Sequence, residues 1–206
     1  FDLIDLLRPE DSPLSGRVAT YDIEASGLGY LFAFADAQQA TTFGSLIEAF
    51  GRSGAIATCC SAEIIDGVAS GKYLIAYNVL GSYALARAGE NPDLVVVAPD
   101  DYTLVLARAA IIPKTAREPE TAGALIDFLL SDAGLAALRS ANLTGETGSD
   151  AHAALRLPDN PEAILRPIAL SPALLVGLDQ HKRREFVARW RANFPKDNGT
   201  GQQPPK

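Results

Sequence analysis

Apolar residues alternate between two patterns along this chain, and together they predict an α/β protein. Short apolar runs such as Ala55–Thr58 and Tyr102–Arg108 are typical of buried strands. Between such runs, apolar residues recur every three or four positions, as in Pro119–Leu130, which predicts amphipathic helices. Strands that alternate with helices favour largely parallel pairing.

Helix boundaries follow from residues that favour helix ends. Helices are expected from Ser26 to about Ala40, over Thr42–Phe50 with Gly51 as its end, and from an N-cap at Ser61 to just before Gly71. Further helices are expected over Pro119–Leu130, from there to Ser140, over Pro172–Leu178 and over Gln180–Asn193. In the last of these helices, Phe186, Val187 and Trp190 are expected to pack in the core.

The most informative segment is Ser70–Asp101, which reads as a strand, a short helix and a second strand that stops at Pro99. Its first strand, Lys72–Asn78, is apolar on both faces. Polar side chains then gather beyond that strand, at Asn78, Ser82 and Tyr83. Because open α/β sheets bind ligands beyond the carboxyl ends of their strands, the segment predicts a small-ligand site there.

Two further turns allow both a structural and a functional interpretation. The strand Arg17–Asp22 leads into Ser26 and Gly27, where free backbone N–H groups could face an anion or Ser26 could be an ordinary N-cap. Asp101 follows Pro99 and Asp100, so it either completes a polar turn or points a carboxylate into a cleft.

Charge and composition narrow the classes of function. The 206 residues are 48% hydrophobic, which suffices for one large domain or two small lobes, and carry a net charge of −7. That charge argues against a nucleic-acid partner, and the basic run Lys182–Arg184 is interpreted as a solvated helix face. No apolar run reaches the roughly 20 residues of a membrane span. The start at Phe1 and the lack of Met suggest a processed or partial chain.

Few residues of this chain could act as catalytic groups. The adjacent Cys59 and Cys60 are not expected to bond to each other, because the small ring would strain the peptide. They precede a helix start, where a thiolate is stabilised, but no base can be assigned to either. His152 and His181 have no partner at metal-ligand spacing, and no nucleotide or cofactor motif is present. No cofactor is therefore expected.

Several short motifs resemble one known family. They are Leu6–Glu10 with Gly16–Ala19, Ser26-Gly27, Ser70–Lys72 with Ile75–Asn78, Ile112–Ala116, and the helix end Ile126–Ser131. In this order they resemble the second half of the extracellular solute-binding proteins of ABC importers, in the branch that includes ferric-ion-binding proteins. The run Ile-Asp-Phe-Leu-Leu-Ser is the most specific of them.

The resemblance implies a type II periplasmic-binding fold, in which two α/β lobes joined by crossing strands close on a ligand. On this chain, residues 1–16 would end the first lobe, 17–101 would form the second, and 102–195 would return to the first, whose opening part is missing. Residues 196–206 are expected to form a disordered tail. The resemblance also implies a periplasmic location and an ABC permease as partner.

The ligand expected from the resemblance is a small anionic solute. Ferric-binding relatives carry two consecutive tyrosines where this chain keeps only Tyr83, and a trivalent ion needs several anionic oxygens. Iron held by Tyr83 and perhaps Tyr77 is kept as an alternative. The expected ligand-binding residues are Ser26, Gly27, Tyr30, Ser61, Asn78, Ser82, Tyr83 and Asp101.

Two other functions stay open at this point. A sensory module that reports ligand occupancy to a membrane sensor kinase would leave the same sequence features as an importer component. A cysteine-dependent enzyme would use Cys59 or Cys60 as its nucleophile, although no histidine constellation accompanies them.

Overall fold

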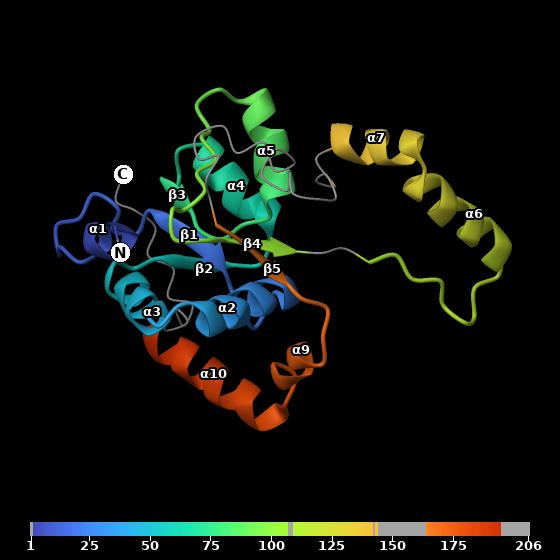
Figure 1. The fold of residues 1–206 in the computed structure, drawn as a ribbon. Coiled ribbons are helices and arrows are strands. Elements are labelled where there is room, and N and C mark those ends of the chain that lie inside the picture. Colours follow the sequence, from blue (N-terminus) through green and yellow to red (C-terminus); the bar gives the residue numbers. More distant parts are fainter. Residues whose placement is uncertain (1, 107–108, 142, 144–163, 195–206) are drawn as a thin grey trace. The chain divides into compact units, whose positions relative to one another are not determined.

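A computed structural model describes residues 2–106, 109–141, 143 and 164–194 of the chain (Figure 1). The chain divides into two compact units. Unit 1 comprises residues 1–78 and 171–206, and unit 2 comprises residues 79–170. The lobe boundaries expected after residues 16 and 101 stay predictions.

Unit 1 is built on a three-stranded parallel sheet in the order β2-β1-β3. The central strand β1 (Val18–Tyr21) pairs with β2 (Ile56–Thr58) on one side and with β3 (Ile75–Ala76) on the other. Every residue of β1 is buried. A strand that is covered on both faces needs a nearly continuous apolar sequence, and such a run can be predicted from sequence.

Helices cover both faces of this sheet (Figure 1). The helices of unit 1 are α1 (Asp2–Leu7), α2 (Gly27–Gln39), α3 (Phe43–Arg52), α4 (Ser61–Ala69), α9 (Ala173–Val176) and α10 (Gln180–Asn193). Helix α2 contacts β1 and α3, whereas α4 contacts β1 and β3. The main core lies with α2 and α3 and centres on Val18, Ile47 and Phe50, all of which are fully buried.

Helix α10 packs against the rest of unit 1 through aromatic rings and through the ion pair of Arg191 with Glu24. Trp190 stacks on Phe194 at 4.4 Å between ring centroids, and Phe186 packs against Tyr30 at 5.7 Å. Phe186, Val187 and Trp190 therefore belong to the core, as predicted.

The start of α10 is capped by Asp179. Its carboxylate accepts from the backbone N–H groups of Lys182 and His181, and these bonds lower the pKa of Asp179.

Unit 2 contains a separate two-stranded parallel sheet, in which β4 (Thr103–Leu106) pairs with β5 (Leu165–Ile168). Its helices are α5 (Gly81–Glu90), α6 (Pro119–Leu130) and α7 (Asp132–Ser140). Within the described ranges no single helix is long and apolar enough to span a membrane. The bent pair of α6 and α7 passes that test jointly, by length and composition alone.

The structure corrects three sequence-based expectations and adds one strand that was not predicted. The expected buried strand Lys72–Asn78 is reduced to Ile75–Ala76, with Lys72 and Leu74 exposed. The run before Pro99 forms no strand, and its Val95 and Val97 are 69% and 71% exposed, because no described strand pairs with it. Gly51 does not end its helix, since α3 continues to Arg52. Strand β5 was not predicted because its sequence, LRPI, contains an arginine and a proline. The predicted tail at 196–206 lies outside the described residues.

Gly51 marks the closest approach of α3 to α10, which generates a test of this packing. A Cβ at Gly51 would lie 2.1 Å from the backbone O of Asn193, whereas a Cβ at Gly44 of the same helix would meet nothing within 4 Å. Gly51→Ala is expected to lower the free energy of unfolding by about 1–3 kcal/mol. The matched Gly44→Ala should instead raise it by about 0.4–1 kcal/mol, because alanine favours the helix and reduces the entropy of the unfolded chain. Urea denaturation measures both, and equal effects would contradict the described contact between α3 and α10.

Candidate functional site

Three turns follow the carboxyl ends of β1, β2 and β3, and they define the candidate site. They are Asp22–Ser26 after β1, Cys59-Cys60 after β2 and Tyr77-Asn78 after β3. Because both pairings of β1 are parallel, all three turns lie at the same edge of the sheet. This edge, here called the carboxyl edge, is where open α/β sheets bind ligands.

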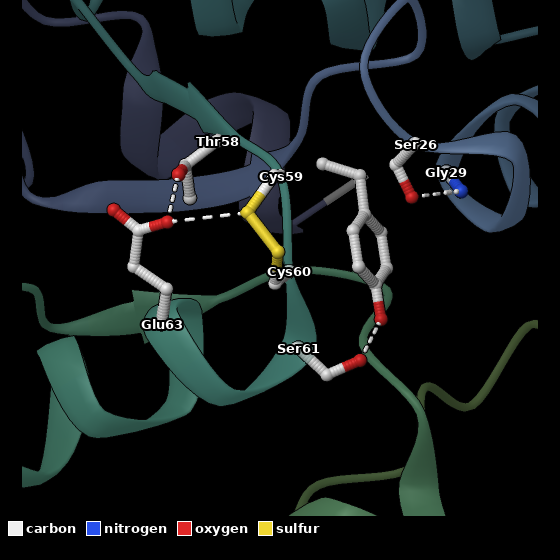
Figure 2. Close-up of a disulfide and its surroundings, with 8 residues drawn as sticks. Ser26, Gly29, Thr58, Cys59, Cys60, Ser61 and Glu63 are labelled. Atoms are coloured by element: carbon white, nitrogen blue, oxygen red, sulfur yellow. Dashed lines mark hydrogen bonds between the residues drawn. A yellow bond between two sulfur atoms is a disulfide. The ribbon is translucent and has the colours of Figure 1, made fainter.

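The first turn presents the start of α2. Ser26 is the N-cap, with extended backbone, and its Oγ accepts from the backbone N–H of Gly29 at 3.0 Å (Figure 2). Gly29 must lack a side chain, since a Cβ there would lie 2.3 Å from Cβ of Tyr21. Gly27 is exposed and has open space around it. The N-cap interpretation of Ser26 is thus confirmed, and its role toward an anion stays a prediction.

The second turn differs from its prediction, because Cys59 and Cys60 are joined by a disulfide (Figure 2). The expectation that adjacent cysteines would not bond to each other was wrong. Cys60 is the N-cap of α4, and its backbone is extended, at φ −137° and ψ 141°. It therefore marks the point where the chain passes from β2 into the helix. With both sulfurs in the disulfide, neither is a free nucleophile in this form.

Ser61 also takes a different place from the one expected. It is the first residue of α4 and not its cap, and its hydroxyl shares a hydrogen bond with the hydroxyl of Tyr21, so that it links α4 to β1. Ser61 is buried. The role of Ser61 in binding a ligand therefore stays a prediction, and a ligand would have to compete with the bond to Tyr21.

A carboxylate stands beside the disulfide. The hydroxyl of Thr58 donates to Oε2 of Glu63 at 2.5 Å, and Sγ of Cys59 lies 3.5 Å from the same oxygen (Figure 2). Both contacts are on the exposed side of the turn. Sequence reasoning did not single out Thr58 or Glu63, although Glu63 stands in the first turn of α4, where a carboxylate is favourable.

The third turn is held by a buried acid that sequence reasoning missed. Asp36 on α2 is 3% exposed, and its Oδ2 accepts from the hydroxyl of Tyr77 at 2.7 Å and from Nδ2 of Asn78 at 3.0 Å. Asn78 has a positive φ of 55°. Asp36 is therefore the protein partner of the Asn78 amide. The sequence did carry one signal for it, because Asp36 is the single acid in Leu31–Ala37, an otherwise apolar segment of α2.

The interior beside Asp36 has no room for a solute. The cavity lined by Asp36, Thr20, Phe50 and Tyr77 offers about 10 Å³ to the centre of a water molecule, which is roughly what one water needs. The carboxyl edge, in contrast, supplies polar groups at the surface of unit 1.

The hydroxyl of Tyr30 already has a protein partner within unit 1. It donates to the backbone O of Gly177 at 2.7 Å, and the Tyr30 ring packs against Phe34 and Phe186. Burial raises the pKa of Tyr30, and Arg183, which lies over the ring at 5.1 Å, partly opposes that shift. The predicted role of Tyr30 toward a ligand would have to compete with this packing.

The remaining predicted residues belong to unit 2. Ser82 and Tyr83 lie in the first turn of α5, and the side chain of Tyr83 is 52% exposed. Oδ1 of Asp101 accepts from the backbone N–H of Tyr102. Ser26 and Asn78 belong to unit 1, so any shared role with these three residues stays a prediction. In the described part of the chain, no group of three or more His, Cys, Asp or Glu residues could hold a metal ion.

The bond between Asn78 and Asp36 can be tested with two substitutions. Asn78→Gly keeps the positive φ accessible but removes a hydrogen bond to a buried carboxylate, which should lower stability by about 1.5–3 kcal/mol. Asn78→Ala loses the same bond and also strains the backbone, so it should be roughly 1 kcal/mol less stable than Asn78→Gly. Urea denaturation of both variants gives the difference, and wild-type stability in Asn78→Ala would refute this account of the turn.

Two comparisons with known proteins identify the family of this chain. The family model described as bacterial extracellular solute-binding protein matches residues 2–142. The structure is similar to the substrate binding protein of the ABC transporter from Agrobacterium tumefaciens, with a TM-score of 0.79 and 34% sequence identity. That match covers 93% of this chain and 57% of the other, so this chain spans little more than half of its relative. No curated protein matches the sequence. The expected family and fold class are confirmed, and the chain belongs to the bacterial extracellular solute-binding proteins.

Proposed function

We propose that this chain supplies a solute-binding surface to the binding protein of an ABC-type importer, and that the carboxyl edge of unit 1 is that surface. The observation that carries the proposal is the parallel β2-β1-β3 sheet, which gathers three polar turns at one edge. The family and the similar structure are binding proteins, which supports capture and release of a solute over its chemical conversion.

The solute proposed is a small anion. Helices α2 and α4 both begin at the carboxyl edge, so that backbone N–H groups of two helix starts are available to a negative group. Glu24, two residues before the N-cap of α2, is paired with Arg191: Nε of Arg191 donates to Oε1 of Glu24 at 2.9 Å, and its second guanidinium nitrogen donates to Oε2. This pairing reduces the negative charge that an anion would meet. At the start of α4, Glu63 keeps a negative charge in the first turn, so the start of α2 is the more favourable of the two for an anion. Ser82, Tyr83 and Asp101 stay predicted contacts from unit 2.

A membrane permease is the proposed partner, and the periplasm is the proposed location, by analogy with the family. A sensor kinase as the partner would use the same solute-binding surface. No observation favours the ferric alternative, since the hydroxyl of Tyr77 is engaged with Asp36.

Native mass spectrometry tests the proposed function on the protein isolated from its own compartment without refolding. The expected result is one retained small organic anion per chain, which is released on unfolding. A mass increase equal to one iron ion would replace the proposal by the ferric alternative. A retained neutral molecule would contradict the anionic assignment.

A serine pair tests where the solute binds. The hydroxyl of Ser26 accepts from Gly29, and its proton can donate to an anion. Ser26→Ala should weaken retention roughly 10- to 100-fold, because a hydrogen bond to a charged group contributes roughly 1.5–3 kcal/mol. The control Ser45→Ala alters an exposed serine on α3 and should retain the solute as wild type does. Equal retention in both variants would place the solute away from the start of α2.

A further inference from the structure

We propose that the Cys59–Cys60 disulfide is a redox-active site that exchanges with small-molecule thiols. Both cysteines are exposed, and they stand between β2 and α4 at the carboxyl edge. The inference does not depend on the identity of the solute or on the proposed transport role. It rests on the partners that the structure holds ready for each sulfur after reduction.

The first partner is the start of α4, which faces Cys60. Cys60 is the N-cap of this nine-residue helix, and its side chain makes no capping hydrogen bond while its sulfur is bonded to Cys59. Reduction frees the sulfur of Cys60, and a free N-cap side chain can accept the backbone N–H groups of the first helical turn. A thiolate there is stabilised by those N–H groups and by the helix dipole.

The second partner is Glu63, which faces Cys59. Sγ of Cys59 lies 3.5 Å from Oε2 of Glu63, within the range of a sulfur hydrogen bond. A disulfide sulfur carries no proton, so this contact becomes a hydrogen bond only when Cys59 is a thiol. The neighbouring carboxylate also disfavours a thiolate on Cys59. The two sulfurs therefore differ, with Cys60 disposed to be the thiolate and Cys59 the thiol.

This asymmetry sets the direction of exchange. An external thiolate attacks Sγ of Cys59, the bond between the two cysteine sulfurs breaks, and the electron pair leaves on Cys60, the better leaving group. A second external thiolate then attacks the external sulfur of the mixed disulfide. It forms the external disulfide and releases Cys59, which takes up a proton. In sum, the protein disulfide and two thiols give a protein thiol, a protein thiolate, one external disulfide and one released proton.

The same partners make the disulfide easier to reduce than a purely structural one. A disulfide becomes a stronger oxidant when its reduced form is stabilised, and here both reduced sulfurs gain an interaction. Exposure of both residues gives a small thiol access.

Two single-cysteine variants test the asymmetry. Cys59→Ser leaves the thiol of Cys60 at the helix start, and Cys60→Ser leaves the thiol of Cys59 beside Glu63. The rate of alkylation by iodoacetamide is measured at about pH 6.5 and divided, for each variant, by its rate at about pH 10, where both thiols are ionised. Dividing the two rates removes differences in access between the two thiols. Because the thiolate is the reactive form, the ratio for Cys60 should exceed the ratio for Cys59 by roughly tenfold or more. Equal or reversed ratios would overturn the assignment.

Wild-type protein tests the exchange itself and does not depend on the variants folding. Incubation with reduced glutathione, followed by acid quenching, alkylation and intact mass measurement, should show two added alkyl groups. Limited alkylation of the reduced protein at about pH 6.5, read by tandem mass spectrometry, should mark Cys60 before Cys59. If the folded protein stays oxidised under conditions that reduce the urea-unfolded chain, the disulfide is structural and the proposal fails.

Discussion

The organisation of unit 1 depends on the burial of β1 between two parallel neighbours. Every residue of this strand is buried, and its pairing with β2 and β3 satisfies the backbone on both edges. Parallel pairing then requires the chain to leave all three strands at the same edge and to return through a helix each time. The starts of α2 and α4 and the turn of Asn78 meet there as a consequence of topology.

One buried charge ties this edge to the helical layer. Asp36 on α2 accepts from both Tyr77 and Asn78, so the turn after β3 is bonded to the helix that follows β1. A buried carboxylate is tolerable only with such partners, and losing either donor leaves part of its charge unsatisfied. The disulfide gives the neighbouring turn a covalent constraint of its own, and its reduction would loosen one side of the same edge.

The parts of the fold that were predictable from sequence are those set by local pattern. The helix Pro119–Leu130 and the N-cap at Ser26 carry periodicity or capping chemistry, and both were found as expected. Long-range partners were not predictable, because no local signal records them. The apolar run before Pro99 pairs with none of the strands in the described part of the chain. Strand β5 contains a proline, which is unusual in a strand, and Asp36 is stabilised by residues some 40 positions away. The Cys59–Cys60 bond was missed because a general argument about ring strain was applied to an individual turn.

Hydrogen exchange of the protein with its co-purified solute, compared with protein stripped of that solute, tests the central claim most directly. The account predicts slower amide exchange in the solute-bound form at residues 22–29, 59–64 and 77–78, which are the three turns and the helix starts that follow two of them. Slower exchange confined to the surface groove of α10, lined by Arg183, Arg184 and Arg191, would contradict it and place the solute elsewhere in unit 1.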